Sequence, residues 1–205
     1  MAKAYQVRVL LMRTGESTWE AQGRLGGLAD VPLTQAGIDQ VAKVAGELGT
    51  PKFAAVLCAP DQASIQTAKL VAGGTGTPIR QINDLAEVDI GLWEGLLERE
   101  LGARCPTAYR QWSECPASVC APSGEVPEQA AERLMDALTR ALDRIKADQG
   151  AVAVVLRPLA FGLAAAGLRG ETARECGTLA RRGCEVQWHT VAVGGTRRGL
   201  VRATG

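Results

Sequence analysis

Apolar runs of strand length alternate along this chain with stretches of helical periodicity, and this alternation constrains the fold more than any other feature. Residues 7–12, 53–57 and 151–156 are largely apolar runs that predict buried strands. Between them, apolar residues recur at the three- and four-residue spacing of one helix face. Such alternation is typical of a layered α/β fold. We therefore predict a three-layer α/β/α sandwich with a mostly parallel central sheet.

Capping residues and prolines place several helix boundaries. Thr34 is suited to begin a helix as its N-cap, and Gly49 is suited to stop that helix. Pro127 predicts the start of a long amphipathic helix that ends near Gly150. Pro158 is well placed to open the helix that follows the strand 151–156.

Three further segments complete the predicted architecture. A short strand is expected over 78–82. Residues 184–190 alternate in the manner of a half-exposed last strand, with His189 on the exposed face. The segment 96–125 is less regular and carries several Cys and Pro residues, so we predict a small inserted helical or loop subdomain there. The whole of 1–205 is expected to form one domain around this insertion.

Composition argues against several classes of partner. The formal net charge is +1, which gives no electrostatic basis for binding nucleic acid or an anionic membrane. No uncharged apolar run approaches the length that spans a bilayer, and the N-terminus lacks the pattern of a secretion signal. We therefore expect a soluble, cytoplasmic protein without nucleic-acid or membrane partners.

Six cysteines raise the question of a metal site. Cys105, Cys115 and Cys120 share one loop-rich stretch, but their spacing lacks the C-x-x-C pattern of a zinc knuckle. Scattered reduced thiols are the favoured interpretation, and a zinc site is the disfavoured one. We predict no metal and no cofactor.

A tetrapeptide that follows the first predicted strand carries the main functional signal. Arg13-Thr14-Gly15-Glu16 resembles the Arg-His-Gly-Glu signature of the histidine phosphatase superfamily, the phosphoglycerate-mutase-like proteins. The similarity continues in order along nearly the whole chain. It includes Gly23-Arg24, Asp30-Val31-Pro32-Leu33-Thr34, Cys58-Ala59-Pro60, Gln66-Thr67-Ala68, Leu85-Ala86-Glu87, Gly91, Trp93-Glu94-Gly95 and Ser123-Gly124-Glu125.

The resemblance implies a role for individual positions. In that family one histidine accepts a phosphoryl group, two arginines and a second histidine clamp it, and a carboxylic acid protonates the leaving oxygen. By this likeness Arg13 is the first clamp and Glu87 the acid. Thr14, Ala63 and Arg157 stand where the nucleophile, the second arginine and the second histidine would be. The single histidine of the chain is His189, far away in sequence.

These replacements lead to the prediction of a catalytically inactive member of the family, with a binding, regulatory or assembly role. A threonine hydroxyl without an adjacent base is a poor nucleophile, and a lost electrostatic donor costs about 10²–10³ in rate. The expected ligand-binding residues are Arg13, Glu16, Arg24, Glu87 and Arg157, with a phosphate or carboxylate as ligand. The favoured hypothesis is that the carboxylates pair with the arginines and close the pocket.

Two other functions stay open. The chain could be an enzyme with changed chemistry, which uses Glu87 as general acid or base on an anionic substrate held by Arg13 and Arg157. It could also be an assembly subunit or homodimer, with 112–122 as the partner surface and Trp93 and Trp112 as anchors. Thr14 or Cys58 as a replacement nucleophile is disfavoured, because neither has an evident activating neighbour.

Overall fold

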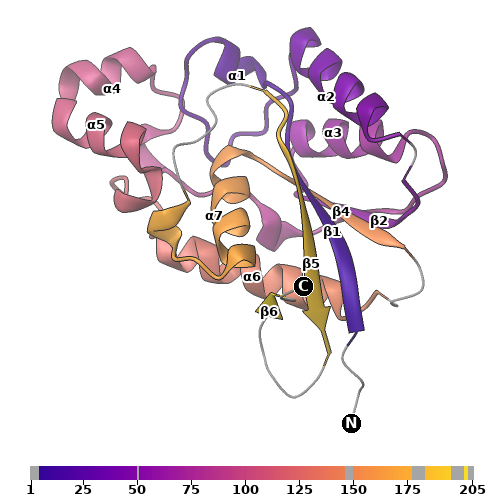
Figure 1. The fold of residues 1–205 in the computed structure, drawn as a ribbon. Coiled ribbons are helices and arrows are strands. Elements are labelled where there is room, and N and C mark those ends of the chain that lie inside the picture. The colour runs from indigo at the N-terminus through magenta and orange to yellow at the C-terminus, as the bar shows by residue number, and fades with distance from the viewer. Residues whose placement is uncertain (1–4, 50, 146–149, 177–182, 195–200, 203–205) are drawn as a thin grey trace.

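The computed structural model describes residues 5–49, 51–145, 150–176, 183–194 and 201–202. A mixed sheet runs through the molecule in the order β3-β2-β4-β1-β5-β6 (Figure 1). The first four strands are parallel to one another, whereas β5 is antiparallel to β1 and pairs in turn with β6. The strands are β1 (Tyr5–Arg13), β2 (Phe53–Cys58), β3 (Ile79–Gln81), β4 (Ala151–Leu156), β5 (Val186–Val193) and β6 (Val201–Arg202).

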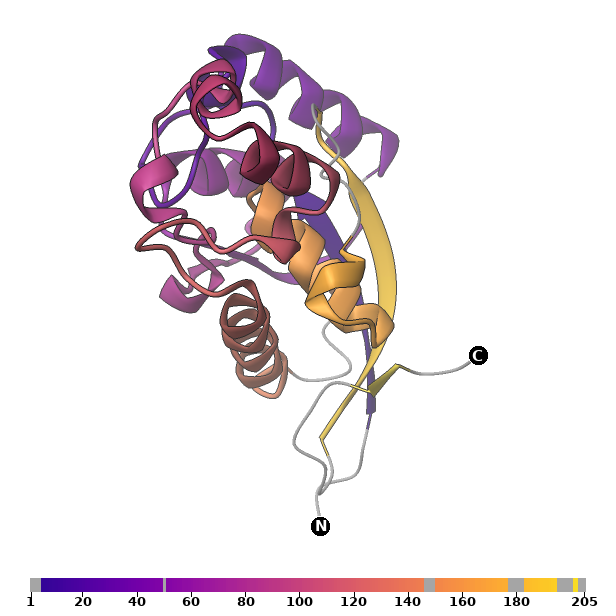
Figure 2. The same ribbon diagram turned by 90° about the vertical axis from the view of Figure 1, so that its left-hand side faces the viewer.

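Helices cover both faces of this sheet, which confirms the predicted α/β layering (Figures 1 and 2). Successive residues of β1 point to opposite layers: Val9 and Leu11 pack in the cluster that contains α6 and α7, while Met12 packs against α2. The helices are α1 (Thr18–Ala21), α2 (Gln35–Glu47), α3 (Gln62–Ala72), α4 (Glu98–Arg104), α5 (Pro106–Glu114), α6 (Pro127–Leu142) and α7 (Pro158–Arg169). Single 3₁₀ turns are η1 (Asn83–Leu85), η2 (Gly91–Trp93), η3 (Pro116–Ser118) and η5 (Ala173–Glu175).

The segment 96–125 is mostly helical. It contains α4, α5 and η3, which stand apart from the sheet layers in Figure 1. Trp112 of α5 meets Trp93 edge to face, with ring centroids 6.5 Å apart. Trp93 is buried and Trp112 packs against the main core, so both rings act as internal packing groups. This contact accounts for both rings by internal packing, and a partner surface over 112–122 stays a prediction.

The end of α6 differs from the sequence prediction. The helix ends at Leu142 and not near Gly150. Ile145 then turns inward and is 2% exposed, and its carbonyl accepts a hydrogen bond of 2.6 Å from the Tyr5 hydroxyl. Ile145 continues the apolar spacing of this helix in the sequence. It is apolar because it is buried beyond the end of α6, and not because the helix extends to it.

In β5, buried and exposed residues alternate in the opposite order to the one predicted for residues 184–190. Trp188 is 41% exposed, and the Arg8 guanidinium lies 4.5 Å from its ring centroid. His189 pairs with Val9 and so shares its face, which looks towards α6 and α7. The buried apolar residues of β5 are Val191 and Val193, beyond the stretch on which the prediction was based.

A close approach of two glycines holds the turn that follows β1. A Cβ on Gly37, in the first turn of α2, would collide with the carbonyl oxygen of Glu16. A Cβ on Gly15 would collide with the carbonyl oxygen of Gly37. The turn after Arg13 can therefore rest directly on α2 only because neither residue has a side chain.

We expect Gly37→Ala to destabilise the fold by about 1–3 kcal/mol, since the backbone of Glu16 would have to move. Gly46→Ala is the matched control in the same helix, where the added methyl group meets open space. It should stabilise the protein by about 0.5–1 kcal/mol through helix propensity. Urea unfolding measures both changes, and a Gly37→Ala midpoint at or above that of the wild type would contradict this account.

Candidate functional site

A cavity of about 180 Å³ opens where β1 and β4 end. Ligands of open α/β sheets bind at this carboxyl edge of the strands. Arg13 ends β1, Arg157 directly follows β4, and Glu87 comes from the loop after η1. The rest of the wall includes Glu20, Arg24, Glu98, Trp112, Ser113 and Pro116.

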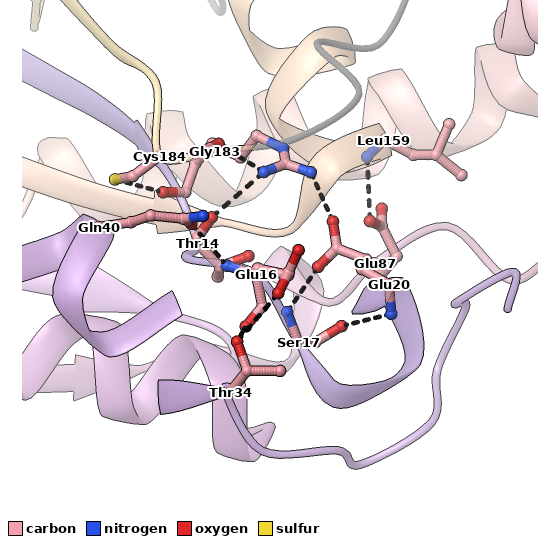
Figure 3. Close-up of polar contacts among 11 residues, drawn as sticks. Thr14, Glu16, Ser17, Glu20, Thr34, Gln40, Glu87, Leu159, Gly183 and Cys184 are labelled. Carbon is pink, nitrogen blue, oxygen red and sulfur yellow. Dashed lines mark hydrogen bonds and ion pairs between the residues drawn. The ribbon is translucent and has the colours of Figure 1, made fainter. Parts of the chain in front are cut away.

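Arg13 is almost fully buried, with its side chain 3% exposed, and its guanidinium is held in place by several contacts. Its Nη2 lies 2.5 Å from Oε1 of Glu20, and its Nη1 donates to the carbonyl oxygen of Gly183 (Figure 3). Its Nε is buried and finds no hydrogen-bond partner in the described part of the chain. The guanidinium is thus a fixed, partly neutralised cation at the end of the sheet.

Glu20 lines the cavity and contacts Arg13, and the sequence analysis did not single it out. Its Oε2 accepts from the Ser17 amide, and its own amide donates to the Ser17 hydroxyl, which together form a capping box at α1. The Ser-x-x-Glu spacing of residues 17–20 could have indicated this box from sequence. The free Oε1 of the same carboxylate is the atom that meets Arg13.

Arg157 lines the cavity and also donates hydrogen bonds to the backbone of the loop 26–29. Its Nη1 donates to the carbonyl oxygens of Gly27 at 2.9 Å and Ala29 at 2.8 Å. Gly26 lies so close that a Cβ there would be 2.7 Å from Nη2. Arg157 therefore ties the loop 26–29 to the end of β4, and among the described residues only its Nη1 donates a hydrogen bond.

Glu87 is a carboxyl group buried at the N-terminus of α7. Its Oε1 accepts from the amides of Val88 at 2.8 Å and Ala160 at 2.7 Å, and its Oε2 accepts from Leu159 at 3.0 Å (Figure 3). Burial raises the pKa of Glu87, against the opposing influence of Arg157 and these three amides. Because Oε2 accepts only one hydrogen bond, it is the oxygen with room for a proton.

Four of the five predicted ligand residues line the cavity: Arg13, Arg24, Glu87 and Arg157. Glu16 does not line it, because its carboxylate turns to the Thr34 hydroxyl, 3.1 Å away. The pairing expected for Glu16 is made by Glu20 instead. The prediction of a closed pocket is also wrong, since a cavity remains between three arginines and three glutamates.

The other predicted positions lie close to the cavity without lining it. Thr14 is 1% exposed, and its amide donates to the carbonyl oxygen of Leu156 at 2.9 Å. Within the described hydrogen bonds, no base accepts from the Thr14 hydroxyl. Ala63 is fully buried in the cluster that contains Met12 and Val41, so it contributes packing and no charge.

The buried thiols are poorly suited to nucleophilic attack. Burial raises the pKa of Cys58 to about 11 and that of Cys184 to about 12, so both stay protonated at neutral pH. The described residues include no group of three or more His, Cys, Asp and Glu side chains that could hold a metal ion. None of the helices that the structure describes is long and apolar enough to cross a membrane.

Several known proteins resemble the chain in sequence. Phosphoserine phosphatase 1 of Hydrogenobacter thermophilus is 30% identical over 119 residues, which cover 58% of this chain and 56% of that protein. The metal-independent phosphoserine phosphatase of Arabidopsis thaliana is 29% identical over 144 residues, which cover 69% of this chain and 60% of that protein. The chain thus spans less than two thirds of the length of these relatives.

Solved structures share the fold at lower identity. YhfR of Bacillus stearothermophilus superposes with a TM-score of 0.78 at 23% identity, covering 96% of this chain and 95% of that one. A mycobacterial glucosyl-3-phosphoglycerate phosphatase in complex with VO₃ superposes with a TM-score of 0.78 at 21% identity, covering 90% of each chain. These likenesses show the same mixed α/β architecture.

The names of these relatives contradict the prediction of a catalytically inactive protein. The sequence relatives and several structural neighbours are named as phosphatases, which favours an enzyme. The prediction rested on the replacements at Thr14, Ala63 and Arg157, and it took them together as the loss of activity. Arg13, Glu87 and Arg157 nevertheless line one open cavity.

The remaining comparison concerns the family. A family model described as the histidine phosphatase superfamily (branch 1) matches residues 9–197, which is most of the chain. The match includes Arg13 at the end of β1, the loop that carries Glu87, and Arg157 directly after β4. The chain therefore belongs to the histidine phosphatase superfamily.

Proposed function

We propose that the chain is an enzyme that hydrolyses phosphate monoesters, with Glu87 as general acid and with Arg13 and Arg157 as the groups that hold the phosphate. One observation carries the proposal: a buried carboxyl group faces the same open cavity as two buried arginines. Titratable groups of this kind in a cleft are candidates for acid–base chemistry. The phosphatase names of the relatives support the same reaction class.

The charges around the cavity suit a phosphate when Glu87 carries its proton. Three arginines and three glutamates line the wall, so protonation of Glu87 leaves one positive charge in excess. Arg157 keeps its Nη2 free of hydrogen bonds to the described residues and can offer it to a phosphate oxygen. A phosphate oxygen would also compete with Glu20 for Arg13.

The reaction fits a single displacement by water. Water attacks phosphorus, the bond from phosphorus to the ester oxygen breaks, and the departing oxygen takes the proton from Glu87. The proton released by the attacking water returns to the Glu87 carboxylate, so the enzyme is restored and an alcohol and inorganic phosphate are formed. We assign attack to water because the Thr14 hydroxyl is buried and no base among the described residues is hydrogen-bonded to it.

The substrate side of the cavity is formed by the helical segment. We propose that the insertion 96–125 contacts the alcohol part of the ester, because its residues Trp112, Ser113 and Pro116 line the same cavity as the arginines. A mixed wall of this kind suits a small, partly polar alcohol. The phosphoserine phosphatases among the relatives act on an ester of this class by name. A cytoplasmic location stays a prediction from the sequence.

Release of inorganic phosphate from a panel of small alkyl phosphates tests the proposal. We expect kcat to fall as pH rises through the pKa of Glu87, because only the protonated carboxyl group can donate. Single-turnover reactions with ³²P-labelled substrate should leave no label on the protein. Label on Thr14 would overturn the water mechanism, and no phosphate release from any monoester would overturn the function.

A further inference from the structure

We propose that Arg133 and Glu125 form a positioning pair that fixes the backbone carrying Glu87, so that its carboxyl group stays aligned with the departing oxygen. The inference rests on the proposed role of Glu87 as the acid. Neither residue lines the main cavity together with the arginines and Glu87, so the pair acts through the acid and not on the substrate. The sequence had singled out the turn 123–125 without giving it a function.

The two side chains meet in a bidentate ion pair. Arg133, from α6, places Nε 2.8 Å from Oε1 of Glu125 and Nη2 2.7 Å from Oε2. Both side chains are partly buried, at 24% and 20% exposure. Two parallel charge-assisted hydrogen bonds fix the plane of the guanidinium as well as its position.

The Arg133 guanidinium also contacts backbone carbonyl oxygens in residues 84–87, the segment that carries Glu87. Nη1 donates to the carbonyl oxygens of Asp84 at 2.9 Å and Ala86 at 3.1 Å, and Nη2 lies 3.5 Å from that of Glu87. This segment has only the single turn η1 as regular structure. Arg133 therefore supplies backbone partners that a strand or helix would otherwise supply.

Glu125 fixes the far end of the same segment through its backbone. Its amide donates to the carbonyl oxygen of Asp89 at 2.8 Å. The approach is close, because a Cβ on the neighbouring Gly124 would lie 2.7 Å from that oxygen. Residues 84–89 are thus held at both ends by one ion pair and the turn that precedes α6.

The pair also sets the charge that Glu87 experiences from this side. Arg157 acts on Glu87 from the end of β4 and Arg133 acts on it from α6, while Glu125 and Asp84 act in turn on Arg133. Arg13, Glu20, Arg24 and Glu98 face it across the cavity. Removing only the Glu125 charge leaves Arg133 unneutralised, which favours ionised Glu87. The decrease of kcat with rising pH should then begin at a lower pH than in the wild type.

The test compares two substrates that need the acid to different degrees. An alkyl phosphate releases a strongly basic alkoxide and needs the proton, whereas p-nitrophenyl phosphate releases a stable phenolate and does not. Misplacing a reacting group by about 1 Å costs about 10² in rate, so Arg133→Gln should lower kcat for the alkyl ester by about that factor. KM and the rate with p-nitrophenyl phosphate should change far less. Arg133→Lys should restore only part of the loss, because it lacks the fork that bridges Glu125 and the carbonyls.

Arg140→Gln is the matched control. Arg140 lies on the same helix and binds Asp84 of the same segment at 2.7 Å, but through its exposed carboxylate and not through the backbone. It should leave both rates nearly unchanged. Equal losses on both substrates for Arg133→Gln, or an unshifted pH limb for Glu125→Gln, would overturn the positioning role and leave only a structural one.

A double-mutant cycle separates this inference from the proposed function. If Arg133 acts through Glu87, Arg133→Gln should add no further loss in a Glu87→Gln background. An additive loss would overturn the positioning role while the acid role stands. If Glu87→Gln alone leaves alkyl phosphate hydrolysis unchanged, the acid role itself fails, and the positioning role fails with it.

Discussion

Replacing Glu87 with Gln is expected to lower kcat for alkyl phosphate hydrolysis by about 10²–10⁴, the contribution typical of a positioned general acid. Gln keeps the volume of the side chain and one carbonyl oxygen, but it has no carboxyl proton to give to the departing alkoxide. KM should change little, since the phosphate is held by Arg13 and Arg157. Steady-state kinetics on one alkyl phosphate, with the wild type measured in parallel, give the comparison.

Two controls make the result specific. Glu132→Gln removes an exposed carboxylate on α6 and should leave kcat unchanged. Hydrolysis of p-nitrophenyl phosphate should fall much less than hydrolysis of the alkyl ester, and the falling limb of the pH profile should disappear. Because the Gln amide would face the Leu159 N–H, unfolding is measured for the same variant. A folded Glu87→Gln enzyme with wild-type kcat would exclude the acid role.

Local signals in the sequence predicted much of the fold. The strand β4 begins and ends at the residues expected from its apolar run, and Thr34 caps α2 with its hydroxyl on the Gly37 amide at 2.9 Å. Pro127 and Pro158 open α6 and α7 as expected. These features follow from a few neighbouring residues, so a single sequence contains the information that fixes them.

Features that depend on tertiary contacts could not be predicted in the same way. The partner of Arg13 proved to be Glu20, because α1 folds back over the end of β1 and Glu16 turns to Thr34. The phase of β5 is set by its pairing with β1 and by the helices that cover one face. The spacing of the residues does not predict the partner of Arg13 or the phase of β5, because both depend on elements distant in the chain.

The structure brings most of the expected ligand residues to one cavity, whereas the names of the relatives contradict the prediction of inactivity. Arg13, Arg157 and Glu87 come from three separate segments, and the resemblance of those segments to one family indicated that they meet. The prediction of inactivity rested on the attacking group at Thr14 and on two of the clamping positions, Ala63 and Arg157. In phosphoryl transfer, positioning and electrostatic stabilisation supply most of the catalysis, and the proposed function assigns these roles to Arg13 and Arg157.

Replacing Arg13 with Met is expected to lower kcat/KM for phosphate monoesters by about 10²–10³, the cost of removing one preorganised electrostatic donor. The change removes the cation and also leaves the Glu20 carboxylate unpaired in the cavity wall, where it repels the substrate. Binding and turnover should both suffer, in contrast to the effect of Glu87→Gln. Isothermal titration with inorganic phosphate and steady-state kinetics measure the two components.

The reciprocal variant decides whether Arg13 serves the ligand or only its own ion pair. Glu20→Gln keeps an acceptor for the Ser17 amide but removes the charge that competes with phosphate for Arg13. If the guanidinium binds phosphate, this variant should bind inorganic phosphate more tightly than the wild type while Arg13→Met binds it more weakly. If the two residues only brace α1 against the sheet, both variants should lose stability and neither should change phosphate affinity. Opposite shifts in affinity are expected, because phosphate and Glu20 are two anions that compete for one buried cation.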